Sequence, residues 1–186
     1  MLKAIASKRE TQRTSIRALE KSHPKLVQYM KTGGVEANLI RILRIKKMIT
    51  REQCERALIH RRSRKKMVDV LIHLDYINED RVLTYLSRLF NCRIIDISEL
   101  MINPTTVREF SYQLAKKNMV FPLMLKKGGW VLSMNNPLDY KGIIDVHVET
   151  GQVVHSVTIS TKKNLVKAYK KYYKISDDEC KSFFMG

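Results

Sequence analysis

A dense run of cations is the part of this sequence best suited to bind an anion. Arg61, Arg62, Arg64, Lys65 and Lys66 place five positive charges within six residues. Because arginine can pair with two phosphate oxygens at once, such a run suits a phosphate group or an anionic lipid headgroup. Most charge runs form solvated loops instead, in which water screens the repulsion between like charges. The sequence leaves both interpretations open.

The positive charge is concentrated in the first third of the chain. The net charge is +17 over 186 residues. Residues 1–66 hold 19 Lys or Arg against 5 Asp or Glu, whereas the remaining residues hold 16 against 13. This asymmetry predicts a polyanionic partner, which can be nucleic acid, anionic lipid or an acidic protein face. A lysine-rich solvated surface is the alternative explanation.

Other reactive residue types occur without the spacing that catalysis or metal binding requires. Cys54, Cys92 and Cys180 form no Cys-x-x-Cys pair, and the five histidines lack metal-ligand spacing, so no metal site is predicted. Cys54 falls on an apolar helical face and is expected in the core. There is no P-loop, no dinucleotide-binding glycine motif and no nucleophile elbow. We therefore expect no catalytic residues, no nucleotide hydrolysis, and a binding module rather than an enzyme.

The cationic run lies at the junction of two predicted helical hairpins that repeat with an offset of 28 residues. Residues 39–43 and 67–71 each form a short amphipathic pattern, followed by a turn and a second amphipathic pattern. Thr50 and Gln53 have the spacing of a capping box at the start of the second helix. Asn78 is expected to cap the corresponding helix of the second hairpin.

The apolar period changes toward that of strands near Asn91. The predicted order after this point is a helix from Asn103-Pro104, strands over 119–125 and 130–134, a helix over 138–146, a strand over 152–159 and a helix over 161–173. Pro122 places the first strand at a sheet edge or a bulge. Residues 126–129, Lys-Lys-Gly-Gly, are typical of a hairpin turn.

These patterns predict the α+β class, with N-terminal tandem helical hairpins followed by a small αββαβα subdomain. The predicted units are a basic N-terminal arm and helix (1–36), the tandem helical-hairpin repeat (37–91), the small α/β subdomain (92–173) and a tail (174–186). Residues 1–22 are expected to form a mobile arm or a helix that needs a partner. No apolar run is long enough for a transmembrane helix, and no secretory signal is present. A cytoplasmic location is therefore expected.

Several short motifs together resemble a known family. They are residues 94–97 (Ile-Ile-Asp-Ile), 120–123 (Val-Phe-Pro-Leu), 131–134 (Val-Leu-Ser-Met), 136–139 (Asn-Pro-Leu-Asp) and Tyr172-Tyr173. With the preceding hairpins they resemble the N-terminal domain, of the MshE type, of the assembly ATPases of bacterial type II secretion and type IV pilus systems. The resemblance covers roughly residues 37–173. It does not include an ATPase motor domain, so we expect a piece of a longer ATPase or a stand-alone relative.

The resemblance implies a non-catalytic module that docks a motor ATPase onto an inner-membrane platform protein. Some members bind cyclic di-GMP through repeats with an Arg-Leu-Gly start, a glycine at the turn and a late glutamine. Here the first repeat has Lys47 and His60 at the last two positions, and the second has Asp75 and Leu89. These departures argue against cyclic di-GMP binding, although Lys66 keeps the cation and the neighbouring arginines can hold a phosphate. No other cofactor is expected.

Two functional hypotheses follow. The first is an interaction or regulatory module of a secretion or pilus machine, with the five junction cations as the anion-binding residues. Its expected partners are an inner-membrane platform or motor protein and an anionic membrane surface, so it would lie in the cytoplasm, peripheral to the inner membrane. The second is a basic nucleic-acid-binding protein, because helical hairpins with basic faces can lie along a phosphate backbone.

Overall fold

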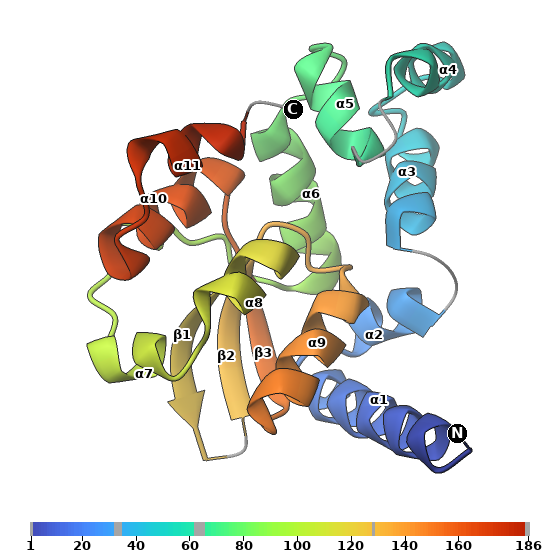
Figure 1. Cartoon of the computed structure of the whole chain (residues 1–186). Helices are drawn as coiled ribbons and strands as arrows, with labels where there is room; N and C mark the ends of the chain where they lie inside the picture. Colours follow the sequence, from blue (N-terminus) through green and yellow to red (C-terminus); the bar gives the residue numbers. More distant parts are fainter. Residues whose placement is uncertain (1, 32–34, 62–65, 128, 185–186) are drawn as a thin grey trace.

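The computed structural model describes residues 2–31, 35–61, 66–127 and 129–184. Two lobes are visible in Figure 1. The helical lobe consists of α3 (Val35–Ile45), α4 (Arg51–His60), α5 (Met67–His73) and α6 (Glu79–Phe90). The α/β lobe contains β1 (Val120–Lys126), β2 (Gly129–Met134) and β3 (Val154–Ile159), with α7 (Pro104–Arg108), α8 (Tyr112–Asn118), α9 (Tyr140–Thr150), α10 (Lys162–Tyr173) and α11 (Asp177–Ser182). The predicted α+β class is confirmed.

The backbone confirms the 28-residue repeat in detail. At the end of α3, Lys47 has a left-handed φ of 53°, and the amide of Met48 donates to the carbonyl of Leu43. At the end of α5, Asp75 has a φ of 52°, and the amide of Tyr76 donates to the carbonyl of Leu71. Both ends therefore have the same Schellman-type termination, which turns the chain into the next helix.

The helix starts that the sequence predicts in this lobe are confirmed. Thr50 and Gln53 form the capping box of α4, with the Gln53 amide donating to Thr50 Oγ1 at 3.1 Å and the Thr50 amide donating to Gln53 Oε1 at 2.8 Å. The side chain of Asn78 accepts from the amides of residues 80 and 81 and caps α6. Asn91 ends α6 with a left-handed φ of 54°, at the position where the apolar period changes.

The sheet has the order β1-β2-β3, with β1 antiparallel and β3 parallel to β2. β1 is an edge strand, and its register shifts between Pro122 and Met124, as the position of the proline predicts. The two hairpin strands pair as far as Lys126 and Gly129; Gly128 of the predicted turn lies outside the described residues. Gly129 has a φ of 134°, and a Cβ there would lie 2.2 Å from the carbonyl oxygen of Val153, so the close approach of β2 to the residue before β3 requires glycine.

Two predicted helices differ in their bounds from those found. The single helix expected from Asn103 is divided into α7 and α8, because the Ser111 hydroxyl accepts from the Leu114 amide at 3.1 Å and starts a new helix. The helix expected over 138–146 is instead α9, which begins at Tyr140. Asp139 caps it by accepting from the Gly142 amide at 3.2 Å, so the preceding residues stay in a turn.

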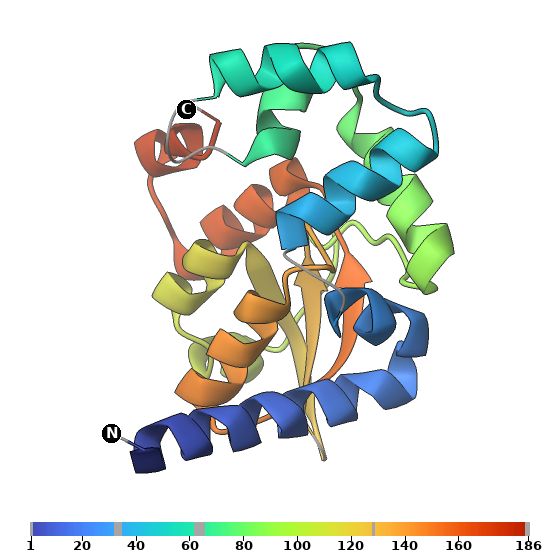
Figure 2. The same ribbon diagram turned by 90° about the vertical axis from the view of Figure 1, so that its right-hand side faces the viewer.

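The N-terminal segment is a helix, α1 (Leu2–Ser22), followed by α2 (Pro24–Lys31). α1 packs against β3 and α9 across the sheet edge, as Figure 2 shows. Between these two helices, His23 is only 6% exposed, and its Nε2 accepts from the Val157 amide of β3 at 3.3 Å. Ser15 Oγ lies 2.5 Å from His147 Nδ1 of α9. Of the two alternatives for this segment, the helix with a partner is therefore the one found.

The Tyr172-Tyr173 pair, which contributes to the family resemblance, anchors a long connection before the sheet. The Tyr172 hydroxyl donates to the Leu100 carbonyl at 2.7 Å and accepts from the Ile102 amide at 2.9 Å. The Tyr173 hydroxyl donates to the Phe110 carbonyl at 3.0 Å. Both tyrosines thus hydrogen-bond backbone groups of the connection and hold it against α10.

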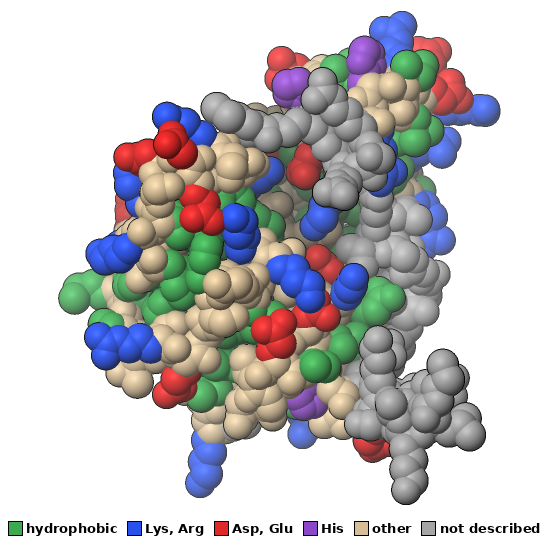
Figure 3. All heavy atoms as spheres, in the orientation of Figure 1, with side chains coloured by type: hydrophobic (Ala, Val, Ile, Leu, Met, Phe, Trp, Pro, Cys, Tyr) green, Lys and Arg blue, Asp and Glu red, His purple; other side chains and the backbone are tan. Residues whose placement is uncertain are grey.

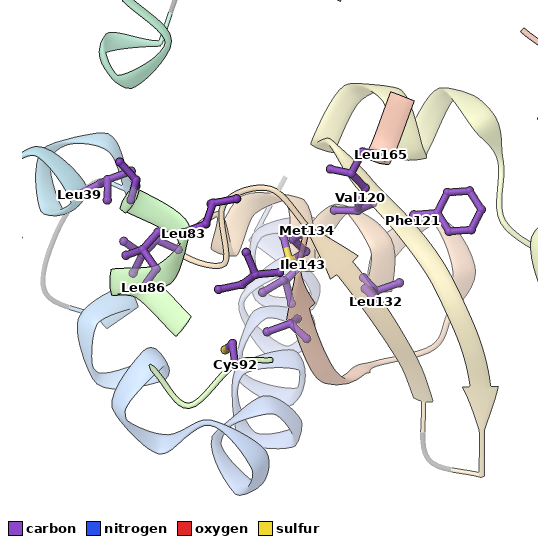
Figure 4. Packing of buried hydrophobic residues seen from close by; sticks show 14 of the residues in the cluster. Leu39, Leu83, Leu86, Cys92, Val120, Phe121, Leu132, Met134, Ile143 and Leu165 are labelled. Atoms are coloured by element: carbon purple, nitrogen blue, oxygen red, sulfur yellow. The ribbon is translucent and has the colours of Figure 1, made fainter. Parts of the chain in front are cut away.

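The buried residues form one apolar cluster with side chains from both lobes, and Figure 4 shows part of it. Leu39, Leu83 and Leu86 come from the helical lobe, whereas Leu132 and Met134 come from β2. In the C-terminal tail, for which the sequence alone predicts no order, α11 packs against α10. None of the described helices is both long and apolar enough to cross a membrane.

Candidate functional site

The helical lobe carries a groove of about 990 Å³ between the C-terminal half of α3, the start of α4 and the start of α5. We call it the basic groove, and it is lined by Ile40, Arg41, Arg44, Ile45, Lys47, Ile49, Thr50, Arg51, Arg61 and Met67. The lining includes five cations, and none of these described lining residues is acidic or aromatic. Over α4, Figure 3 shows basic, acidic and hydrophobic side chains next to one another.

Helical periodicity in α3 separates the cations from the core. Leu39, Ile42 and Leu43 are buried, whereas Arg41 and Arg44 are exposed. Because these arginines are three residues apart, they lie on the same side of the helix. The same amphipathic pattern that packs α3 onto the lobe therefore holds two guanidinium groups at the groove.

The turn after α3 and the start of α4 add two more cations. Lys47 is held in its left-handed conformation by the Schellman-type termination, and Arg51 is the first residue after the Thr50 cap. Arg51 also pairs with Glu55 at 2.8 Å on the exposed surface of α4. Within the described part of the chain, Arg41, Arg44 and Lys47 make no ion pair. These three therefore bring charge to the groove that no ion pair among the described residues offsets.

The structure separates the two described members of the predicted anion-binding run. Arg61 is exposed at the C-terminal end of α4 and lines the basic groove. Lys66 precedes α5 and lines a different cavity, where its Nζ lies 3.8 Å from Asp139 Oδ2. Arg62, Arg64 and Lys65 lie outside the described residues.

That second cavity lies between the two lobes and has a volume of about 420 Å³. Apolar side chains of α5 and α6 line one side, and asparagines from the α/β lobe line the other. Its charged lining residues are Lys66, Lys117 and Lys141 together with Asp69, Glu79 and Asp139. Because the two signs balance, this cavity offers an anion less net attraction than the basic groove does.

The electrostatic surroundings do not suggest acid–base or metal chemistry among the described residues. Burial raises the pKa of the Cys54 thiol, against the opposing effect of Arg44, so this thiol stays protonated. Burial also raises the pKa of Cys92, to about 12. His, Cys, Asp and Glu residues of the described ranges do not gather in a group of three or more that can hold a metal ion.

Sequence reasoning missed four groove cations: Arg41, Arg44, Lys47 and Arg51. These four residues contribute to the charge excess of the first third of the chain. The predicted anion-binding residues were instead Arg61 and its neighbours, because the cations are densest at that junction. The spacing of Arg41 and Arg44 was the available signal, because it places both on the polar side of a predicted helix. That α4 closes the other side of the groove depends on tertiary packing.

The second half of the chain matches a known protein family. Residues 90–179 match the model of the MshEN domain. This part of the chain is similar to an MshEN domain. The predicted resemblance to the N-terminal domains of secretion and pilus ATPases is thereby confirmed. The match includes the Pro122-Leu123, Asn136–Asp139 and Tyr172-Tyr173 motifs and begins where the helical-hairpin repeat ends.

Two solved structures have the same fold. One is MshE with cdg, cyclic di-GMP, at 20% sequence identity and a TM-score of 0.60, with 73% of this chain and 98% of that chain covered. The other is the N-terminal domain of XpsE, at 15% identity and a TM-score of 0.62, with 76% of this chain and 97% of that chain covered. No curated protein matches the chain significantly. The MshEN match and the shared fold support a regulatory or interaction module of secretion or pilus ATPases.

Proposed function

We propose that the chain is a non-catalytic interaction module of a type II secretion or type IV pilus machine, and that it docks to an inner-membrane platform or motor protein. The match of residues 90–179 to the MshEN domain is the main support for this proposal, because it relates the chain to the secretion and pilus ATPases. The basic groove adds a physical means of contact, since its cations favour an acidic protein face. The module would then lie in the cytoplasm, at the surface of the inner membrane.

The junction cations belong to the same proposal. Arg61 lines the basic groove, and the sequence continues with Arg62, Arg64, Lys65 and Lys66. We assign all five residues to anion recognition by the docked partner, with anionic lipid headgroups as a second source of the same attraction.

Cyclic di-GMP is not part of the proposed function, although the related MshE was solved with it. Lys47 and Asp75 occupy the two turn positions at which the sequence motif of the binding members has glycine. Both have left-handed backbone conformations and carry exposed side chains. The Cβ and the longer side chain limit the close approach of a flat base to the backbone. Titration of the chain with cyclic di-GMP should give no heat of binding in a calorimeter.

A two-hybrid assay in bacterial cells tests the docking. The full chain is paired with the cytoplasmic region of each inner-membrane component of the secretion or pilus apparatus in the same genome. We expect one platform or motor component to interact, and a charge-matched basic domain of another fold to give no signal. If no component interacts while the purified chain binds duplex DNA tightly, the nucleic-acid hypothesis replaces this one.

A further inference from the structure

We propose that the basic groove holds an acidic amphipathic helix of a partner protein. This inference rests on the proposed function only in expecting that partner within the secretion or pilus apparatus. The occupant itself is inferred from the charge, the exposed apolar side chains and the size of the groove, which are considered in turn.

Charge requires an anionic occupant. Arg41, Arg44, Lys47, Arg51 and Arg61 line the groove without an acidic lining residue among those described, and of these Arg51 already pairs with Glu55 on the surface of α4. Like charges brought together in this way repel one another, and carboxylates of a bound partner would offset that repulsion. Arginine favours carboxylates in particular, because its planar fork can pair with both oxygens.

The apolar lining requires that the occupant also bury hydrophobic side chains. Ile40 and Ile45 lie among the cations, whereas the other two apolar lining residues, Ile49 and Met67, are already buried in the core. Ile45 is 67% exposed, although Ile42 and Leu43 on the same helix are buried in the core. Leu58 and Ile59, shortly before Arg61 on α4, are 55% and 82% exposed. Large apolar side chains that remain exposed beside a groove are typical of a surface for another protein.

The size of the groove matches a helix. An α-helix about 10 Å wide with a pitch of about 5.4 Å occupies roughly 400 Å³ per turn. A groove of about 990 Å³ therefore accommodates about two turns. An amphipathic helix presents apolar residues at the i, i+3, i+4 and i+7 positions over this length and acidic residues beside them.

The other two polyanions fit this surface less well. A bilayer is nearly flat on this scale and favours cations that protrude, whereas these cations line a recess between helices. Single-stranded nucleic acid is bound through aromatic side chains on which bases stack, and the described lining residues include none. A protein helix satisfies both the charge and the apolar lining.

The acidic residues at the C-terminus of this chain are already engaged, so the occupant is expected to come from another protein. Glu179 of α11 accepts from Tyr112 at 2.8 Å and from Lys116 at 2.6 Å. Asp177 pairs with Lys170, and Asp178 pairs with Lys181 at 3.3 Å. Insertion of α11 of a second copy into the groove would break these contacts.

Fluorescence anisotropy with a defined probe tests the occupant. The probe is a labelled, alanine-based helical peptide of about 14 residues with leucines on one side and glutamates on the other. A second peptide has lysine in place of glutamate, and a third has the leucines replaced by serine. Vesicles of phosphatidylglycerol and phosphatidylcholine are titrated in parallel. The full chain is used throughout.

The variants separate charge from apolar contact. The double variant Arg41→Glu/Arg44→Glu reverses the groove charge, and Arg108→Glu/Lys163→Glu makes the same change at exposed sites elsewhere. Ile45→Asn removes an exposed apolar side chain from the groove, and Met101→Asn does the same at a residue that is 99% exposed outside it. All four variants change exposed residues, so far-UV circular dichroism and the melting temperature should stay close to those of the wild type.

We expect the glutamate peptide to bind, and the lysine and serine peptides not to bind. Arg41→Glu/Arg44→Glu should weaken binding about tenfold or more, and Ile45→Asn should weaken it measurably, whereas both control variants should bind like the wild type. Equal binding of the glutamate and lysine peptides, or equal loss in the groove and control variants, would overturn the proposal. Vesicle binding that depends on the groove, without peptide binding, would overturn it in favour of lipid.

The peptide-binding experiment and the docking assay can fail independently of each other. A platform protein that binds equally well to the wild type and to Arg41→Glu/Arg44→Glu would leave the proposed function standing and reject the groove as its site. Groove-dependent binding of the peptide, without interaction with any component of the apparatus, would support the helix-binding groove and reject the proposed function.

Discussion

The carboxylate of Glu79 joins the two lobes through Asn135: Asn135 Nδ2 donates to Glu79 Oε1 at 2.7 Å. Glu79 begins α6 in the helical lobe, whereas Asn135 follows β2 in the α/β lobe. The same Oε1 accepts from the amide of Lys162, the first residue of α10, at 3.0 Å. One half-buried carboxylate thus satisfies a side-chain amide and a free amide at a helix start, and fixes the cavity wall between the lobes.

Glu79→Ala should lower the free energy of unfolding by about 2 kcal/mol, because two donors lose a charged acceptor. Asp80→Ala is the matched control, since Asp80 lies in the same first turn of α6 but is exposed. It should cost no more than about 0.5 kcal/mol. Urea unfolding of the three proteins measures both values. Equal losses in the two variants would show that only the interaction with the helix dipole matters.

Stability should depend on pH through His23. Burial is the main cause that lowers the pKa of His23 from its ordinary value of 6.5, and the Val157 amide needs the neutral Nε2 as its acceptor. The unfolded chain therefore takes up a proton on this residue more readily than the folded chain. The contribution of His23 is fully present above pH 6.5 and declines as the pH falls below that value.

Urea unfolding of the wild type and His23→Gln at a series of pH values checks this expectation. The glutamine can still accept a hydrogen bond but does not titrate, so the decline below pH 6.5 should become shallower. His60→Asn is the control, because His60 is exposed at the end of α4, and it should keep the wild-type slope. If the slopes of the wild type and His23→Gln were the same, another group would be responsible.

Asp75→Gly should stabilise the chain by about 1 kcal/mol, because glycine adopts the left-handed conformation at this position without steric cost. Asp80→Gly makes the same substitution at a helical position and should give no gain. The melting temperatures of the two variants provide the comparison. A higher melting temperature for both, or for neither, would contradict this explanation of the turn.

Local signals made the helical lobe predictable. The capping box of Thr50 and Gln53, the Asn78 cap and the 28-residue repeat all depend on residues close in sequence, and each is present in the structure. Pro122 likewise indicated an edge strand or a bulge, and both are found. Hydrophobic periodicity and the caps thus provided the order of the elements and the fold class.

Contacts between residues that are far apart along the chain could not be predicted from the sequence. The position of α1 depends on His23 and Ser15, which contact residues more than 130 positions away. To predict the start of α8, Ser111 had to be recognised as a helix cap within a continuous apolar pattern. The basic groove required the packing of α4 beside α3, so its cations could be recognised as exposed but not as neighbours.

Calorimetric titration of the full chain with the cytoplasmic region of the platform or motor protein tests the proposed docking most directly. The comparison includes the wild type, Arg62→Glu/Arg64→Glu/Lys65→Glu and the control Arg108→Glu/Lys163→Glu, at low and high salt. The account predicts saturable binding by the wild type and the control, strong weakening by the junction variant, and weaker binding at high salt. Absence of binding by the wild type, together with tight and salt-dependent binding to duplex DNA, would contradict it.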